Sequence, residues 1–368
     1  MNRIIDFLKK EIVLSVSFVL ALISMFFVPP SENYFDYIDF RTLGLLFSLM
    51  TIMAGLNKMG IFRLLAKNLL NKAKTMRGVT LLLVLLCFFS SMLITNDVAL
   101  ITFVPFSVVL LKLANKQNRM IFVVTLETIA ANLGSMLTPI GNPQNLYLFS
   151  AYNMSISDFF YTIAPYAMLS LGLLVIFLLF SDKSKLANLG DREEVIFDKR
   201  LLTMYAVLFA IALLSVFRVL NYIVLLAVVI VFVLIFDRKV ILKVDYSLLF
   251  TFVFLFIFIG NLGNIAQINS WLSEIVGGNE VVVGVLASQV FSNVPAAILL
   301  SGFTCNAAAL MIGVNIGGLG TLIASMASLI SFKFIQKESV SIAKYLGVFT
   351  LLNVVFLAAN LALWVVVK

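Results

Sequence analysis

The sequence predicts an all-α polytopic membrane protein, built as an inverted repeat with about nine transmembrane spans, two re-entrant hairpins and two broken helices. Three observations lead to this fold class: an apolar composition, basic residues gathered on one side of the predicted membrane, and short motifs that recur in the same order. Hydrophobic residues make up 62% of the 368 residues and charged residues only 12%, with a mean hydropathy of +1.10. Soluble domains carry about half apolar and a quarter charged residues, so this composition suits a protein embedded in lipid.

The N-terminal repeat is predicted to occupy residues 1–181. Its first apolar run, 12–28, resembles a signal peptide, but Val28-Pro29-Pro30 offers no small-residue cleavage site, and we interpret the run as a retained span. In 61–72, apolar residues alternate with lysines at helical spacing, which predicts a helix lying in the membrane interface. The other expected elements of this half are a span at 41–57, a hairpin at 77–113, a broken helix at 120–152 and a span at 158–181.

The polar stretch 182–200 is predicted to be a cytoplasmic linker, after which the C-terminal repeat, 201–368, follows the same order. Its expected elements are spans at 201–217, 219–236 and 248–262, an interfacial segment at 264–276, a hairpin at 280–303, a broken helix at 307–332 and a last span at 345–367.

The basic residues test whether the hairpin arms cross the membrane or return. If both hairpins are re-entrant and the N-terminus is cytoplasmic, only Arg41, Arg218 and Lys368 of the 26 basic residues fall on the outer side. This bias follows the positive-inside rule. We therefore expect a multi-pass protein of the cell inner (cytoplasmic) membrane, with its N-terminus in the cytoplasm and its C-terminus outside.

Three motifs recur in the second half of the chain in the same order. Leu45-Leu46-Phe47-Ser48 reappears as Leu248-Leu249-Phe250-Thr251, Ile94-Thr95-Asn96-Asp97 as Phe291-Ser292-Asn293-Val294, and Asn132-Leu133-Gly134 as Asn315-Ile316-Gly317. An odd number of predicted crossings separates equivalent points, so the two copies are inverted. Inverted repeats place substrate and coupling-ion sites near the midplane of the membrane, at broken helices.

The two predicted hairpin tips carry the first candidate site residues. Polar, non-helical tips persist within lipid only where they line protein or a wet cavity. Their hydroxyls, amides and free helix ends can hold an ion or an anionic group. Ser, Thr and Asn also join helices without binding anything, but their recurrence at equivalent positions favours a site. The expected substrate-binding residues are Thr95, Asn96, Asn142, Ser292, Asn293 and Ser325.

Asp97 is the sharpest single candidate, because a carboxylate at membrane depth is costly and indicates function by default. It would bind sodium directly, or burial would keep it protonated so that it carries a proton. The alternative is a neutral or paired structural acid. Glu127, in the first half of the broken helix, is either a second protonatable group or the partner of an inward-facing lysine.

Glycine and proline interrupt the two broken helices and would bring backbone carbonyls close to a cation. In the first helix the breaks are expected around Gly134 and again at Gly141-Asn142-Pro143, and in the second at the glycines of 317–320. Glycines also serve close helix packing, so both interpretations stay open. The expected ion-coupling residues are Asp97, Asn96, Gly141, Asn145, Glu127, Asn293 and Thr321, with a sodium ion held by Asn96, Asp97 and Gly141.

Several classes of site and partner are not expected. Cys87 and Cys305 lie in apolar context, which disfavours a disulfide framework, and a chain without histidine lacks the usual transition-metal ligands. The net charge of +8 is not accompanied by stacking aromatics in any basic stretch, so nucleic acid is not an expected partner. The expected partners are the lipid bilayer and a small anionic substrate, with no cofactor beyond a coupling sodium ion or proton.

The segment that follows the first tip resembles the ion transporter superfamily, which includes divalent-anion/sodium symporters, citrate transporters, arsenite permeases and one class of sodium/proton antiporters. The resemblance is carried by Ala131-Asn132-Leu133-Gly134-Ser135 and then Thr138-Pro139-Ile140-Gly141-Asn142-Pro143-Gln144-Asn145-Leu146, and it covers essentially the whole chain. It implies a scaffold domain, a mobile transport domain, an elevator-type motion and a homodimer.

The tips depart from the pattern of the symporters in this group, in which each tip reads Ser-Asn-Thr and binds carboxylate and sodium. Asn96 and Asn293 match the middle position, but Asp97 and Val294 stand where the symporters have threonine. The loss of both threonine hydroxyls argues against dicarboxylate binding. The Asn-Asp pair is more similar to the arsenite permease and antiporter branch.

Two functions follow from these expectations. The preferred one is a secondary active transporter that moves a small anion, a carboxylate or an inorganic oxyanion, coupled to sodium or protons. The rival is a sodium/proton antiporter in which Asp97 exchanges the ions. A passive channel has less support, because inverted broken repeats suit alternating access. An enzyme has less still, because the sequence contains no histidine and no nucleophile motif.

Overall fold

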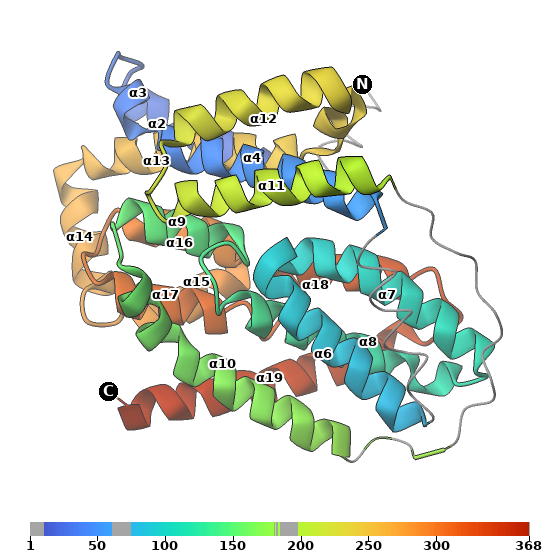
Figure 1. Cartoon of the computed structure of the whole chain (residues 1–368). Helices are drawn as coiled ribbons and strands as arrows, with labels where there is room; N and C mark the ends of the chain where they lie inside the picture. The colour runs from blue at the N-terminus through green and yellow to red at the C-terminus, as the bar shows by residue number, and fades with distance from the viewer. Residues whose placement is uncertain (1–10, 61–74, 180, 182, 185–197, 368) are drawn as a thin grey trace, which may run out of the picture.

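The computed structural model describes residues 11–60, 75–179, 181, 183–184 and 198–367 (Figure 1). Every regular element in these residues is helical, as the composition predicts. The predicted interfacial helix at 61–72 and most of the predicted linker at 182–200 lie outside the described residues.

Seven described helices are long and apolar enough to cross a membrane, or up to eight if one bent pair of helices forms a single span. The bent pair is Ala266–Val276 (α14) and Glu280–Phe291 (α15), which meet at 109°. The seven are Phe40–Lys58 (α4), Met76–Ile94 (α6), Asn96–Leu113 (α7), Ile156–Leu179 (α10), Lys199–Val216 (α11), Tyr246–Gly263 (α13) and Ile342–Val367 (α19). This criterion counts the hairpin arms α6 and α7 as spans and leaves out shorter apolar helices, so the nine-span topology stays a prediction.

The shorter helices complete the described fold. They are Ile12–Phe27 (α2), Tyr34–Tyr37 (α3), Met120–Ser135 (α8), Pro143–Ala151 (α9), Tyr222–Phe236 (α12), Asn293–Ser301 (α16), Ala307–Ile316 (α17) and Met326–Ile335 (α18), with short 3-10 turns at Gln117–Arg119 (η1), Arg238–Lys243 (η2) and Leu322–Ala324 (η3).

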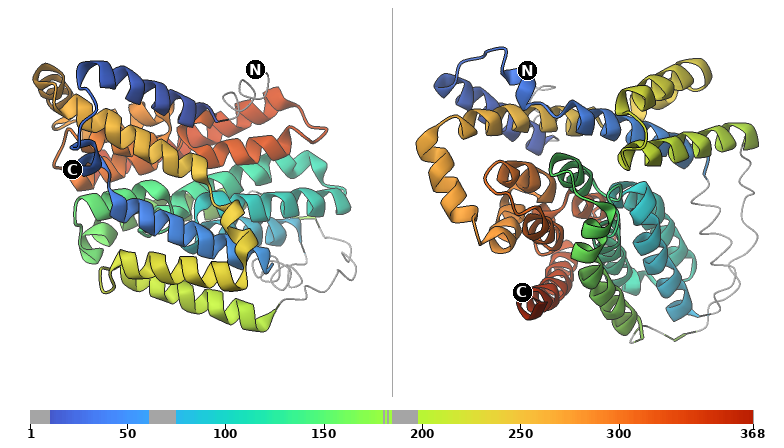
Figure 2. Two further views of the ribbon diagram at one scale, coloured as in Figure 1. Left: turned by 90° about the horizontal axis from the view of Figure 1, so that it is seen from above. Right: turned by 60° about the vertical axis from the view of Figure 1, so that its left-hand side comes forward.

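The helices pack into two groups (Figure 2). One group, here called the peripheral layer, contains α2, α3, α4, α11, α12 and α13. The other, here called the core bundle, contains α6 to α10 and α15 to α19. The two groups meet where α4 contacts α7 and α9 and where α13 contacts α16. Each group therefore takes helices from both halves of the sequence.

Two pairs of helices are each joined by a single residue in the same unusual backbone conformation. Thr95 links α6 to α7 with φ 71° and ψ 154°, and Ser292 links α15 to α16 with φ 72° and ψ 154°. Positive φ is uncommon for residues other than glycine and costs free energy. Figure 1 shows α6 and α7 leading back to the same end of the molecule. The equal geometry supports the predicted matched hairpin tips, while their re-entry into the membrane stays a prediction.

Both predicted broken helices are interrupted in the structure. α8 ends at Ser135 and α9 begins at Pro143, while α17 ends at Ile316 and α18 begins at Met326. The two separate breaks that the sequence predicts in 120–152 are therefore one continuous non-helical stretch. Proline at the first position of α9 explains its abrupt start, because proline needs no hydrogen-bond partner there.

Two glycines permit close approaches at this break. A Cβ on Gly134 would lie 2.1 Å from the Phe88 carbonyl oxygen, and one on Gly141 would lie 2.0 Å from the Ser135 carbonyl oxygen. Gly134 thus lets α8 pack directly on α6, and Gly141 lets the chain fold back onto the end of α8.

Paired acidic caps begin the helices that face the core bundle. Asp39 Oδ1 accepts a hydrogen bond from the Thr42 backbone N–H at 2.9 Å at the start of α4. Asp245 Oδ1 accepts one from the Leu248 N–H at 3.0 Å at the start of α13. Such caps satisfy backbone donors that a helix leaves unpaired at its N-terminus. They also fix where α4 and α13 begin.

The fold predicts opposite exposure for two loop positions. The C-terminal end of α7 and the connection between α16 and α17 lie at opposite ends of the helical bundle in Figure 1. Asn115 follows α7, and Cys305 belongs to the connection between α16 and α17. We expect a membrane-impermeant maleimide added to intact cells to label the native Cys305, which is exposed, and not Asn115→Cys placed in a Cys305→Ser chain. The Cys305→Ser chain alone is the control, because its remaining Cys87 is buried. Labelling of both positions from the same side would rule out the inverted hairpin topology.

Candidate functional site

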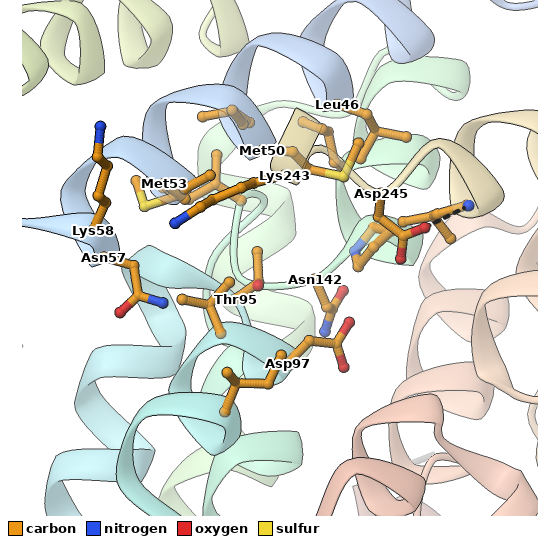
Figure 3. Close-up of a pocket in the computed structure, with 18 of the residues that line it drawn as sticks. Leu46, Met50, Met53, Asn57, Lys58, Thr95, Asp97, Asn142, Lys243 and Asp245 are labelled. Carbon is orange, nitrogen blue, oxygen red and sulfur yellow. Dashed lines mark hydrogen bonds between the residues drawn. The ribbon is translucent and has the colours of Figure 1, made fainter. Parts of the chain in front are cut away.

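A cavity of about 510 Å³ lies between the peripheral layer and the core bundle (Figure 3). The peripheral layer contributes one face of α4 together with the segment from Lys243 to Leu248. The core bundle contributes the first hairpin tip, the break before α9 and the start of α9. The exposed Lys243 and Asp245 show that the cavity reaches the protein surface. The lining residues used below are Met50, Met53, Asn57, Lys58, Thr95, Asp97, Ile101, Asn142, Lys243 and Asp245.

A second, much smaller void of about 20 Å³ adjoins this cavity, since both are lined by Asp97, Pro143, Asp245 and Leu248. Its walls come from the first turns of α7, α9, α13, α16 and α18. The N-terminus of a helix carries unpaired N–H groups and the positive end of the helix dipole. The convergence of these N-termini makes the void a favourable place for negative charge.

Asp97 is the acidic side chain of the core bundle at this void. It lies in the first turn of α7, and its backbone N–H donates to Asn96 Oδ1 at 3.0 Å. Its Oδ1 atom is buried and has no hydrogen-bond partner, and none of the ion pairs of the described residues includes it. A buried carboxylate is costly unless it is compensated or neutralised. The positive helix ends, a proton or a bound cation would each meet this need.

Two asparagines exchange hydrogen bonds between the broken helices in a reciprocal pattern. Asn132, at the end of α8, accepts from Ser325 Oγ at 3.0 Å and donates to Ser328 Oγ at 3.4 Å. Its repeat equivalent is Asn315, at the end of α17. Asn315 accepts from Asn142 Nδ2 at 3.2 Å and donates to Asn145 Oδ1 at 2.6 Å.

The partners of these two asparagines occupy equivalent positions. Asn142 and Asn145 follow Asn132 at the same spacing at which Ser325 and Ser328 follow Asn315. An asparagine of each half thus hydrogen-bonds the side chains at the helix break of the other half. This exchange supports the predicted repeat.

The first hairpin tip is tied into this network. Asn96 donates from Nδ2 to Asn132 Oδ1 at 3.1 Å and from its backbone N–H to the Gly141 carbonyl at 3.2 Å. The Asn145 side chain donates to the carbonyls of Met136 at 2.9 Å and Thr138 at 3.2 Å. Backbone groups that the break releases are therefore bonded by side-chain amides.

The structure brings most of the predicted site residues together. Asn96, Asp97, Asn293 and Ser325 line the small void, Thr95, Asp97 and Asn142 line the larger cavity, and Asn145 lies in the asparagine network. Ser292 is buried at the second tip, where its hydroxyl donates to Asn293 Oδ1 at 3.4 Å.

Like Asn145 and Ser292, three further predicted residues line neither cavity. Gly141 is buried, and its carbonyl already accepts the bond from the Asn96 N–H. Glu127 is fully buried between α8 and α7, where the Ser107 hydroxyl donates to Oε1, and no lysine in the described part of the chain pairs with it. Thr321 is exposed, with its backbone N–H donating to Gln289 Oε1 at 3.0 Å. Both interpretations of Glu127, a protonatable group and the partner of a lysine, stay predictions.

The peripheral layer adds site residues that the sequence did not single out: Asn57, Lys58, Lys243 and Asp245. Lys58 is held by Asp237, whose two carboxylate oxygens lie 2.8 and 2.9 Å from the ammonium. Asp237 also accepts from the Tyr205 hydroxyl at 3.2 Å. The sequence does contain one signal for Asp245, since an acid stands just before each of the two equivalent spans, Asp39 before 41–57 and Asp245 before 248–262.

Comparison with known proteins gives one family and several relatives. The family model described as a citrate transporter matches residues 4–309. An uncharacterized transporter of Methanocaldococcus jannaschii is 33% identical over 94% of this chain and 95% of its own length. The inner membrane protein YbiR of Escherichia coli is 32% identical over 84% of this chain and 83% of its own. The silicon efflux transporter LSI3 of Oryza sativa is 33% identical over 43% of this chain and 32% of its own.

The asparagine exchange predicts strong coupling between two residues far apart in the sequence. Asn142→Ala and Asn315→Ala each remove the bond between the two side chains together with the other bonds of the deleted amide. Each also leaves a buried partner unpaired, which costs about 1–3 kcal/mol. The double variant should be more stable than the sum of the single losses predicts, by about 1 kcal/mol or more. Denaturation of the purified protein in detergent measures this coupling.

The control pair combines Asn315→Ala with Asn269→Ala, because Asn269 is half-buried on α14 and bonds Gly263 and Ser273 instead of the asparagine network. Those two losses should add to within about 0.5 kcal/mol. If the stability losses of Asn142→Ala and Asn315→Ala also add, the proposed role of the hydrogen bond between them is contradicted.

Proposed function

The chain belongs to the citrate transporter family and is therefore a secondary membrane transporter and not an enzyme, and from that premise we propose how it works. It moves a small anion, a carboxylate or an inorganic oxyanion, across the cytoplasmic membrane, coupled to sodium or protons. The observation that carries the proposal is the meeting of five helix N-termini at a void that also contains Asp97.

The coupling arises because the Asp97 carboxylate and the substrate anion compete for the positive helix N-termini. An ionised Asp97 occupies the helix N-termini that would otherwise attract a substrate anion. A proton or a sodium ion on Asp97 cancels that charge and leaves the N-termini free. Cation and anion therefore bind more tightly together than either binds alone, and by linkage each raises the affinity for the other by the same factor.

The position of the cavity supports alternating access by an elevator-type motion. Its walls come from both groups of helices, so sliding of the core bundle along the peripheral layer would carry the hairpin tips while α4 and α13 stay in place. A homodimer joined through the peripheral layer would hold that layer still. The lysines that line the cavity, Lys58 and Lys243, support a cytoplasmic location of this end under the positive-inside rule.

A sodium/proton antiporter is the second candidate. It is favoured by the small void, where Asp97 with its unpaired Oδ1 shares the walls with a second carboxylate, Asp245. In that case the void would hold the exchanging cation, and no anion would be carried. Proteoliposomes tested with labelled citrate, succinate, sulfate and arsenite, and for sodium-driven pH change without any anion, separate the two functions.

Asp97→Asn tests the role of the carboxylate. The amide has the same shape but cannot exchange a proton or a full negative charge. We expect cation-driven uptake to fall at least about 100-fold, since the loss of coupling removes the driving force rather than one contact. Exchange of labelled for unlabelled anion across the membrane should persist, because it needs no net coupling.

Asp158→Asn is the matched control, since Asp158 also lies in the first turn of a helix, α10, but is exposed and outside both cavities. It should transport like the wild type. Wild-type coupling in Asp97→Asn would remove Asp97 from the mechanism under either function.

A further inference from the structure

The larger cavity separates positive from negative side chains. In Figure 3 the ammonium of Lys243 lies on the side of Asn57 and Lys58, whereas the carboxylates of Asp97 and Asp245 lie on the opposite side. A coupling cation belongs at the carboxylate end, where the small void adjoins the cavity. The lysine end therefore offers a second positive position for an anionic group, in addition to the helix N-termini.

The two lysines are not equivalent. Lys58 already has a full ionic partner, because both carboxylate oxygens of Asp237 lie within hydrogen-bond distance of its ammonium. Lys243 has neither an ion pair nor a side-chain hydrogen bond among the residues that the structure describes. Its charge is available to a ligand, and it lies at the end of η2, directly before the cap of α13.

We propose that Lys243 is a substrate-positioning residue that binds the negatively charged group of the transported anion from the side of the peripheral layer. The apolar side chains of Met50, Met53 and Ile101 line the same cavity and would contact the body of the substrate, a small organic carboxylate. The ammonium is a compact charge with three donors, suited to a carboxylate. This inference rests on the proposed anion transport.

Because Lys243 belongs to the peripheral layer, it can contact the substrate in only one relative position of the two groups of helices. The hairpin tips belong to the core bundle, so Lys243 and the tips face one cavity only when the two groups are docked as they are here. A contact made in one state and not in the other changes the relative population of the two states. Lys243 thus raises the affinity for the anion at the face where this cavity opens, and has no effect at the opposite face.

The first experiment compares Lys243→Gln with the wild type in inside-out and right-side-out vesicles, using labelled citrate, succinate and sulfate. Loss of a charged hydrogen bond predicts an increase in KM of about tenfold at the face where the cavity opens. KM at the other face and the maximal rate should stay within about twofold. KM of the wild type should also rise with ionic strength, and Lys243→Gln should flatten that rise, because salt screens an ammonium–anion attraction.

Lys239→Gln is the matched control, since Lys239 lies on the same short turn, is exposed and lines neither cavity. It should leave both KM values unchanged. An unchanged KM in Lys243→Gln at the face of the cavity, or an equal rise at both faces, would overturn the inference.

A second variant distinguishes the loss of the positive charge from misfolding. Lys243→Cys in a Cys305→Ser chain leaves Cys87, which is buried, as the other thiol. Modification of the folded protein with aminoethyl methanethiosulfonate restores a positive charge and should restore the wild-type KM to within about threefold. Methyl methanethiosulfonate, which adds no charge, should not. Equal effects of the two reagents would overturn the inference.

Failure of the proposed function would be seen in the wild type and not only in the Lys243 variants. In that case the wild type would carry none of the three anions and would produce only sodium-driven pH change. Anion transport by the wild type with no change in Lys243→Gln would leave the proposed function intact and reject Lys243 alone.

Discussion

Backbone groups within a bilayer have no water to bond, and the rest of this structure depends on how two interrupted helices meet that constraint. α8 and α17 each end with an asparagine, and the amide of that asparagine hydrogen-bonds side chains at the helix break of the other half. Further amides, above all that of Asn145, bond the carbonyls that the first break releases. Each break is thus stabilised in part by side chains of the other half, and the small void takes its walls from both halves.

The electrostatics of the site follow from the same breaks. Each interruption begins a new helix, α9 or α18, whose N-terminus points at the small void, and each hairpin tip adds another, α7 or α16. The positive field there comes mainly from backbone dipoles and not from basic side chains. Such a field is fixed, so under the proposed mechanism the proton or cation on Asp97 is the charge that changes. Coupling through one carboxylate is the simplest use of this arrangement.

The sequence predicted the elements that depend on local pattern. The sequence predicted the helical hairpin arms and the tips at Thr95 and Ser292, because apolar run length and recurring motifs mark them. Glycine and proline likewise marked the breaks at Gly141-Asn142-Pro143 and at the glycines of 317–320. The sequence did not identify Lys243 or the isolation of Glu127 from the site. The positions of these two residues depend on which faces of neighbouring helices pack together. Nearly uniform apolar helices have little hydrophobic periodicity, so the sequence does not indicate those faces.

Under the proposed mechanism, the inequality of the two tips assigns the coupling to the first tip. The second tip has Val294 where the first has Asp97, and Pro295 next to it lacks a backbone N–H, so α16 offers fewer donors to an anion. The first tip alone joins a carboxylate to a void that is also lined by Asp245 of the peripheral layer. A cation bound there contacts both groups of helices at once, whereas a ligand held by Asn293 contacts the core bundle. Cation binding at the first tip is therefore the event best placed to control how the two groups dock.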